Sequence, residues 1–223
     1  MTKEDINRAI VTIGKDKLSK LPVADYQGKI YIIDNPQNVD DAVENLKRYK
    51  LLGFDTETRP SFKKGQFHDV ALIQLATEES CYLFRTNIIG YPKSLITLLE
   101  DPEIIKVGLS IHDDFHHLKK VSDFNPQGFI DLQSYVKNFK IADNSLSRVY
   151  GILFGDRISK GQRLTNWEAS ELSESQQRYA ALDAYACIKI YEYLNEGKFD
   201  PVKSSYLTLP PDPEEITKDN SDS

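Results

Sequence analysis

Cysteine is almost absent from this 223-residue chain, in which only Cys81 and Cys187 occur. Two widely separated thiols do not form a disulfide framework, so we expect buried free cysteines in a reducing compartment. Long apolar runs are also lacking, and none approaches the roughly 18–20 residues that span a bilayer. The start, Met1 to Asp5, lacks the basic and apolar stretches of a signal peptide. We therefore expect a cytoplasmic protein that does not enter a membrane.

An excess of basic side chains is missing as well. Against 34 Asp and Glu the chain carries 28 Lys and Arg, for a net charge of −6. A protein that coats nucleic acid non-specifically needs a basic surface, so this class is disfavoured. An acidic protein can still process nucleic acid when a local basic rim and bound cations offset its carboxylates. The hydrophobic fraction of 40% is enough for one sizeable core.

Strand patterns dominate the first half of the chain and helix patterns the second. Apolar or β-branched runs predict strands at 29–33, 51–57, 70–75, 81–84 and 104–109. The polar turn 77–80 should join two of them in an antiparallel hairpin. Periodicity and capping residues predict helices at 3–13, 39–49, 110–118, 132–139, 144–153 and 173–195. This order predicts an α/β fold with a mixed sheet flanked by helices, not a purely doubly wound sheet.

The last part of the chain differs in composition from the middle. After Lys198 it becomes polar and rich in proline, as in Leu209-Pro210-Pro211-Asp212-Pro213. Such a segment buries too little apolar area to fold by itself. We therefore predict an N-terminal extension over 1–27, a single α/β domain over 28–198 and a disordered polar tail over 199–223.

Two acids, Asp55 and Glu57, come at the end of a predicted buried strand. Side chains two apart on a strand point to the same face, so these carboxylates should lie together. They would repel each other unless a cation sat between them, and hard cations such as Mg²⁺ prefer oxygen ligands of this kind. Two other Asp-x-Glu pairs, Asp101/Glu103 and Asp212/Glu214, adjoin proline in polar surroundings. Taken alone, the first pair is equally explained by a strand end that frays into solvent.

Another acid, Asp183, lies in a predicted helix that opens with the capping box Ser173-Glu-Ser-Gln176. Tyr179 precedes Asp183 by one helical turn, so both side chains share a face. Several alanines make this helix slim, which permits a close approach to the sheet. Taken alone, the pattern fits an ordinary amphipathic helix with one surface aspartate better.

The pair Asp113-Asp114 follows the predicted strand that ends at 109. Acids at a helix start are often only favourable partners of the helix dipole, and this is the better interpretation of Asp113. His112 and His116 are one helical turn apart, as in some transition-metal sites. No third nitrogen or sulfur ligand is evident nearby, so we disfavour that alternative.

In this order and spacing the motifs resemble the DEDD 3′–5′ exonucleases. The resemblance covers roughly residues 29–195 and rests on Gly53 to Glu57, Val70 to Leu75, Val107 to Asp114, Asn166-Trp167 and Tyr179 to Tyr185. The family includes the exonuclease domain of the Werner syndrome helicase and, at a greater distance, ribonuclease D. It implies a ribonuclease H-like fold and metal-dependent hydrolysis at the 3′ end of DNA or RNA, with release of nucleoside 5′-monophosphates. It further implies two divalent cations, Mg²⁺ or Mn²⁺, and a nucleic-acid partner with a free 3′ end.

The resemblance also assigns roles to residues. The acids that would bind metal and carry catalysis are Asp55, Glu57, Asp114 and Asp183. Asp114, not Asp113, has the family's spacing from Gly108. Tyr179 would orient the attacking water, which implies the tyrosine (DEDDy) subclass, since Arg178 stands where the sister subclass has histidine.

Substrate contacts are implied less directly. Thr56 and Thr58 resemble positions near the terminal sugar, and Phe115 and His116 could flank the terminal base by stacking. Lys160 and Arg163, with Lys63 and Lys64, lie in loops around the motifs and could contact phosphates. For Trp167, core packing is the better interpretation.

Two rival functions remain open from the sequence. One is a phosphodiesterase for short oligonucleotides or a small nucleotide. The other is a weakly active nucleic-acid-binding module on the same fold, which the presence of all four acids and Tyr179 disfavours. No protein partner is indicated, and the preference for DNA or RNA is left open.

Overall fold

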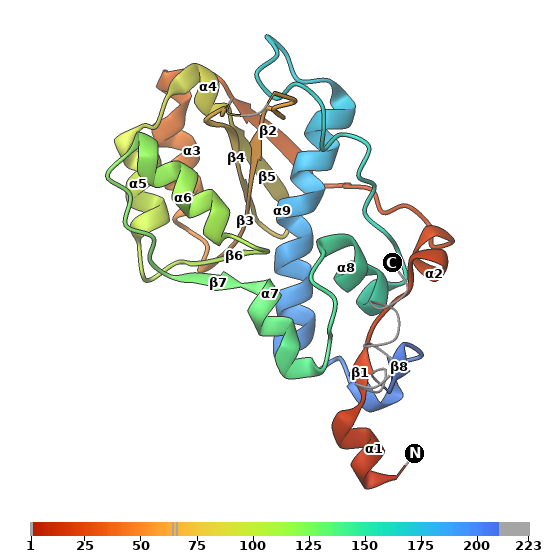
Figure 1. Ribbon diagram of the computed structural model, residues 1–223. Coiled ribbons are helices and arrows are strands. Elements are labelled where there is room, and N and C mark those ends of the chain that lie inside the picture. Colours follow the sequence, from red (N-terminus) through yellow and green to blue (C-terminus); the bar gives the residue numbers. More distant parts are fainter. Residues whose placement is uncertain (1, 64, 66, 210–223) are drawn as a thin grey trace.

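The computed structural model describes residues 2–63, 65 and 67–209 (Figure 1). Its main sheet has the order β2-β5-β4-β3-β6-β7. The strands are β2 (Lys29–Ile33), β3 (Leu51–Thr58), β4 (Val70–Ala76), β5 (Ser80–Phe84), β6 (Ile105–Gly108) and β7 (Phe129–Asp131). Strands β3, β4 and β5 pair antiparallel, whereas the β2/β5, β3/β6 and β6/β7 pairs are parallel. The predicted mixed sheet and its hairpin are confirmed.

Helices cover both faces of this sheet (Figure 1). They are α1 (Lys3–Arg8), α2 (Lys15–Ser19), α3 (Val39–Leu46), α4 (Thr86–Ile89), α5 (Lys93–Glu100), α6 (His112–Val121), α7 (Leu132–Tyr135), α8 (Leu146–Phe154) and α9 (Glu174–Asn195). Helices α3 and α5 bury their apolar sides with one face of the sheet, and α8 and α9 with the other. The two resulting cores hold the central strand β3 from both sides.

Helix α9 crosses the sheet at close range because the residues at the contact are small on both sides. It begins at the predicted capping box of Ser173 and Gln176. A Cβ atom at Gly53 of β3 would overlap the carbonyl oxygen of Ala184, so only glycine permits this approach. Close contact between Gly53 and Ala184 places Asp183, the residue before Ala184, beside the carboxyl end of β3.

The chain ends differ from the sequence-based prediction. The helix predicted over 3–13 ends at Arg8, and the strand β1 (Ile10–Val11) follows and pairs with β8 (Leu207–Thr208). Residues 199–209, predicted as disordered, form a 3₁₀ helix over Pro201–Lys203 and then β8. They are ordered because Tyr206 and Leu207 pack against the core under α9. The rest of the predicted tail, 210–223, lies outside the described residues.

Smaller differences concern helix ends. Helix α3 ends at Leu46, not at Tyr49, and the helix predicted over 132–139 consists of α7 and a 3₁₀ turn. Cys81 and Cys187 are buried and free, as predicted. In the described part of the chain no helix is both long and apolar enough to cross a membrane.

Candidate active site

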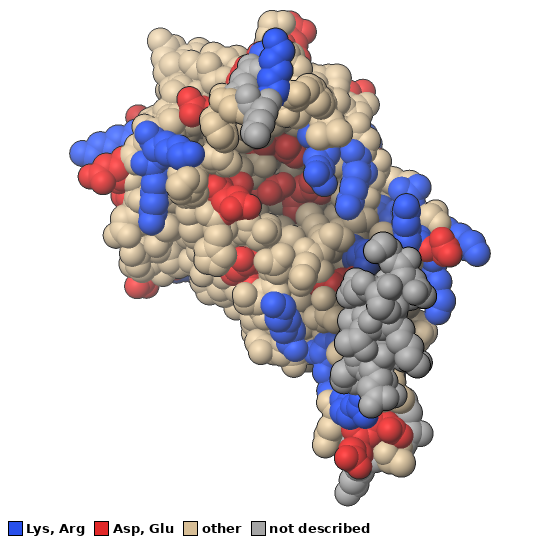
Figure 2. Space-filling model, in the orientation of Figure 1, with Lys and Arg blue, Asp and Glu red and all other residues tan. Residues whose placement is uncertain are grey.

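Three acids from distant parts of the sequence meet at one end of β3. One carboxylate oxygen each from Asp55, Glu57 and Asp183 lie within 4.8 Å of one another. Asp55 and Glu57 share a face of β3, and α9 delivers Asp183. Glu57 and Asp183 are 8% and 7% exposed and Asp55 is half-buried, so this cluster is not a solvated surface patch. Figure 2 shows acidic side chains on the floor of a hollow, with Lys and Arg around its rim.

The fourth predicted acid, Asp114, is placed by an unusual turn. Ser110 has φ of +64°, a backbone conformation that is uncommon outside glycine. The Oδ1 atom of Asp131 stabilises this turn by accepting hydrogen bonds from the backbone N–H groups of Ser110 (2.9 Å) and Gln133 (2.8 Å). Helix α6 then begins, and Asp114 Oδ1 accepts a hydrogen bond from the hydroxyl of Thr56 on β3.

Asp113 and Asp114 therefore face different surroundings. Asp113 is exposed, in agreement with its interpretation as a helix-dipole partner, whereas Asp114 is half-buried. Asp114 stands outside the group of three, yet its charge raises the pKa values of Asp55 and Glu57. Asp114 thus lies on the wall of the same acidic hollow.

Burial and mutual repulsion disfavour the charged forms of these acids. Burial raises the pKa of Asp114 to about 6, of Asp183 to about 7 and of Glu57 to about 9, where Asp183 and Asp114 add to the effect. Burial, followed by the charges of Asp183 and Glu57, raises the pKa of Asp55 well above its usual range. The positive charge of Arg163 opposes the rise at Glu57. A bound cation would reverse this penalty.

The donors present fit a hard divalent cation. Asp183 Oδ1 is buried and has no hydrogen-bond partner among the described residues, which is costly for a carboxylate oxygen. The group of three contains oxygen donors only, the ligand type that Mg²⁺ and Mn²⁺ prefer. The disfavoured histidine site gains no support, since His112 and His116 are exposed and stand outside this group.

Tyr179 borders the cluster from α9. Burial, followed by the charges of Asp183 and Glu57, raises the pKa of its phenol, so the hydroxyl keeps its proton at neutral pH. The fully buried ring of Trp167 packs at 6.1 Å from the Tyr179 ring, between centroids, which confirms core packing for the tryptophan. The phenol is therefore held next to the acids as a hydrogen-bond donor.

The loop between α8 and α9 is tied to the same helix. Gln176 Nε2 donates to Thr165 Oγ1 (3.0 Å) and to the backbone oxygen of Asn166 (3.2 Å). The buried guanidinium of Arg85 donates to the backbone oxygens of Ser170 (2.8 Å) and Ala169. These contacts fix the loop that carries Lys160 and Arg163. Both side chains are exposed, which the predicted phosphate contacts require.

The other predicted substrate contacts differ in their surroundings. Thr58 is half-buried at a register irregularity of β3, and His116 and Lys63 are exposed. Lys64 lies outside the described residues. The Phe115 ring instead packs in an aromatic cluster, 4.7 Å from Phe129 and 5.8 Å from Phe124 between centroids. Phe115 is only half-buried in this cluster, so its stacking on a terminal base stays a prediction.

Gln74 was not predicted as part of the site. It pairs in register with Asp55 across the β3/β4 ladder and is fully buried. Both polar atoms of its side chain lack a hydrogen-bond partner among the described residues. Directly opposite residues in an antiparallel pair share a face, so Gln74 lies beside the acid cluster. The signal available in the sequence was one amide inside the apolar run 70–75.

The sheet order, the acid cluster and the tyrosine beside it define a ribonuclease H-like fold with an acidic active-site hollow. The chain belongs to the 3′–5′ exonuclease family, whose family model matches residues 30–197. Together, family and acid cluster indicate a site for divalent metal.

Individual relatives agree with this assignment. The chain is 35% identical over 161 residues to the mouse bifunctional 3′–5′ exonuclease/ATP-dependent helicase WRN, covering 70% of this chain and 12% of that protein. Its fold matches the Nibbler EXO domain of Aedes aegypti, with a TM-score of 0.70, 22% identity and coverage of 81% of this chain and 97% of that one. It also matches Escherichia coli RNase D, with a TM-score of 0.68, 24% identity and coverage of 75% and 44%. The chain spans about half to three fifths of several shorter curated 3′–5′ exonucleases.

The raised acid pKa values predict a pH-dependent stability of the metal-free protein. Unfolded Asp and Glu titrate near pH 4, whereas Asp183 and Glu57 in the fold titrate at about 7 and 9. The folded state therefore holds more protons, and the free energy of unfolding should fall as the pH rises from about 4 through 9. Asp183→Asn should raise Tm at pH 8 by about 2–8 °C, from a gain of about 1–2 kcal/mol.

Thermal melts in EDTA and in Mg²⁺ test this expectation. Mg²⁺ should raise the Tm of the wild-type protein and have little effect on Asp183→Asn. Asp113→Asn is the matched control, because Asp113 is exposed and its loss should change stability by no more than about 0.5 kcal/mol. A lower Tm for Asp183→Asn than for the wild type at pH 8 would contradict the electrostatic account.

Proposed function

We propose that this protein is a 3′–5′ exonuclease that removes nucleotides from a nucleic-acid 3′ end by two-metal hydrolysis, with Mg²⁺ or Mn²⁺. The observation that carries the proposal is the largely buried cluster of Asp55, Glu57 and Asp183 beside Tyr179, in a chain of the 3′–5′ exonuclease family. The end specificity and the release of nucleoside 5′-monophosphates are carried over from that family. The substrate is DNA or RNA.

Asp55, Glu57 and Asp183 would hold one cation, and Asp55 with Asp114 the other. When bound, the cations would supply charge neutralisation at the phosphate and a lowered pKa of the attacking water. The protonated phenol of Tyr179 positions that water, because a phenol with a raised pKa keeps its proton at neutral pH and so does not take one from the water. Thr56 keeps Asp114 turned toward the hollow through its hydrogen bond.

Basic residues on the rim would attract the nucleic-acid strand, a polyanion that the acidic hollow alone would repel. Lys160 and Arg163 are exposed on the loop between α8 and α9, and the charge of Arg163 opposes the rise in the pKa of Glu57. They would contact phosphates of the substrate strand, which positions the strand without reading its sequence. The overall negative charge then hinders non-specific binding elsewhere on the surface.

Digestion of 5′-labelled single-stranded and recessed-duplex DNA and RNA tests the proposal. With Mg²⁺ or Mn²⁺ we expect a ladder that shortens from the 3′ end, together with nucleoside 5′-monophosphates. EDTA should abolish the activity and added metal should restore it, because the proposed hydrolysis depends on the cations. Without a cation, burial and repulsion disfavour the charged forms of Asp55 and Glu57.

A closed circular single strand provides the control for direction, since it has no 3′ end. Cleavage of that circle would contradict end-directed action. Activity that survives exhaustive chelation would contradict the metal mechanism.

A further inference from the structure

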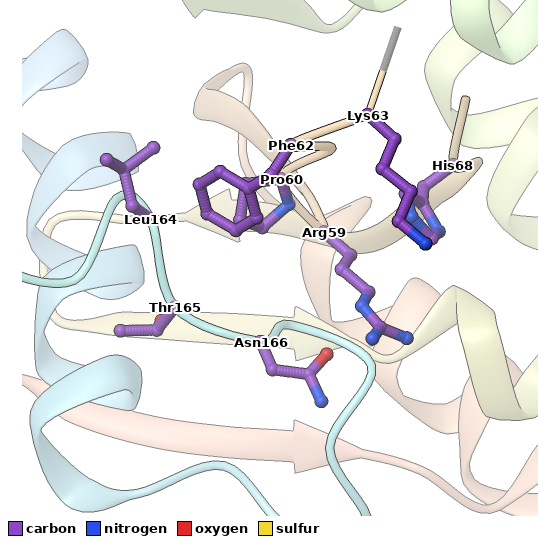
Figure 3. Close-up of a pocket in the computed structure, with 8 residues that line it drawn as sticks. All are labelled: Arg59, Pro60, Phe62, Lys63, His68, Leu164, Thr165 and Asn166. Carbon is purple, nitrogen blue, oxygen red and sulfur yellow. The ribbon is translucent and has the colours of Figure 1, made fainter. Parts of the chain in front are cut away.

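A second cavity, whose lining contains none of the four acids, is formed by two loops (Figure 3). Its volume is about 270 Å³. One loop follows β3 and contributes Pro60, Phe62 and the cations Arg59 and Lys63, and the other precedes α9 and contributes Leu164 and Asn166. Apolar side chains, a neutral amide and two cations therefore line the same space.

The apolar walls are unusually exposed for their size. Phe62 is 81% exposed and Leu164 is 62% exposed. Figure 3 shows them on separate loops, Phe62 beside Pro60 and Leu164 on the loop that leads to α9. No core packing accounts for their orientation, so these side chains are available to a ligand that offers an apolar or aromatic face.

The polar groups of the cavity are partly fixed. Glu168 binds Arg59 at 3.1 Å and His68 Nδ1 at 3.1 Å, which holds one wall in place. Asn166 Oδ1 accepts a hydrogen bond from the backbone N–H of Glu168 (3.1 Å), which leaves the amide NH₂ as a donor. Lys63 is exposed and forms no salt bridge with a carboxylate of the described residues.

Both loops of the cavity are attached to elements that carry the acids. Arg59 directly follows Thr58, the last residue of the strand that carries Asp55 and Glu57. Thr165 and Asn166 accept hydrogen bonds from Gln176, three residues before Tyr179. A strand with its 3′ end at the acids would therefore pass both loops.

We propose that this cavity binds one unstacked nucleobase of the substrate strand, upstream of the nucleotide that is removed. The inference rests on the proposed function and adds the substrate class, a single-stranded 3′ tail. Phe62 stacks on the base, Leu164 closes the opposite side, and Arg59 and Lys63 face the flanking phosphates. A base paired in a duplex cannot enter, so paired 3′ ends must fray first.

The chemistry of the lining favours this occupant over others. The volume is below the roughly 300–1,000 Å³ of pockets that take drug-sized ligands, which suits one base better than a complete nucleotide cofactor. The cations suit a polyanion, and stacking on an aromatic ring tolerates every base because each has a π-face. A non-specific exonuclease needs that tolerance.

The test separates the two sites by substrate length. The p-nitrophenyl ester of thymidine 5′-monophosphate occupies the catalytic hollow alone, whereas single-stranded oligonucleotides of increasing length reach the second cavity. For Phe62→Ala and Leu164→Ala we expect KM on a 12-nucleotide strand to rise about tenfold, with kcat and ester hydrolysis within about twofold of wild type. Phe62→Trp should restore the wild-type KM, because it restores the stacking face.

Phe67→Ala is the matched control. Phe67 lies on the same loop, is 82% exposed and does not line the cavity, so its loss should leave KM unchanged. Fluorescence anisotropy of a labelled 12-nucleotide strand in Ca²⁺ measures binding without turnover and should show the same tenfold loss for Phe62→Ala.

Three results would overturn the inference: an unchanged KM and affinity in Phe62→Ala, an equal loss on the ester and the long strand, or a loss confined to recessed duplexes. The last would mean that the cavity contacts the complementary strand. Failure of the wild-type protein to hydrolyse either substrate would instead refute the proposed function. The anisotropy comparison of wild type with Phe62→Ala would then still show whether the cavity binds the strand.

Discussion

Replacing Asp55 with alanine is expected to lower kcat by at least about 10⁴-fold, because the proposed mechanism assigns the Asp55 carboxylate to both cations. Asp55 sits at the centre of the electrostatic network, where its pKa is raised by burial, Asp183, Glu57 and Asp114 together. Its cross-strand neighbour is the neutral Gln74, so β4 supplies no replacement acid. Asp55→Asn should lose activity to a similar extent, since an amide keeps the shape and removes the charge.

The measurement is single-turnover digestion of a labelled single strand at saturating Mn²⁺. Both variants should remain folded, and the metal-free Asp55→Asn protein should melt at or above the wild-type Tm, since it relieves the repulsion. Asp113→Ala serves as the control and should keep wild-type activity, because Asp113 is exposed and does not belong to the group of three acids. Full activity in Asp55→Ala would undo the whole site assignment.

Local patterns predicted the centre of the fold well. The runs 51–57, 70–75 and 81–84 form strands close to the predicted bounds, because a buried antiparallel hairpin is encoded by apolar residues and one polar turn. The β1/β8 pair could not be predicted in this way. Each of its strands has two residues, and the partners lie almost 200 positions apart. The pair therefore forms because Tyr206 and Leu207 pack against the core, which no local pattern predicts.

The candidate site was predictable in part for a similar reason. The period of two on a strand predicted that Asp55 and Glu57 share a face, and the small residues around Asp183 predicted close helix packing. That Asp183 reaches Asp55 depends on the contact of Gly53 with Ala184, which no local pattern encodes.

Other parts of the site arise only when distant segments meet. Gln74 is conspicuous because its amide is buried without a partner among the described residues, a property that needs three-dimensional packing. Arg85, which holds the loop before α9 through Ser170 and Ala169, is an ordinary strand-end arginine in the sequence. The cavity of Phe62 and Leu164 joins two loops about a hundred residues apart.

Replacing Tyr179 with phenylalanine is expected to lower kcat by about 10²–10⁴-fold while metal and substrate affinity stay near wild type, the range for a lost proton-transfer or positioning group. The ring that packs 6.1 Å from Trp167 would remain, and only the hydroxyl next to Asp183 would be lost. Because the acids are untouched, the rise in Tm on adding Mg²⁺ should be preserved, unlike in Asp183→Asn.

The pH profile gives this prediction a readout that a purely structural role would not change. Burial and the charges of Asp183 and Glu57 raise the pKa of the phenol, so it stays protonated across the working range. The Phe variant should therefore show a uniformly lower rate with an unaltered pH profile, whereas a phenol acting as base would impose its own ionisation on the wild-type profile. A rate equal to wild type in Tyr179→Phe would refute the positioning role. A loss of the Mg²⁺-dependent rise in Tm would instead mean that the Tyr179 hydroxyl is needed for the acid cluster to bind metal.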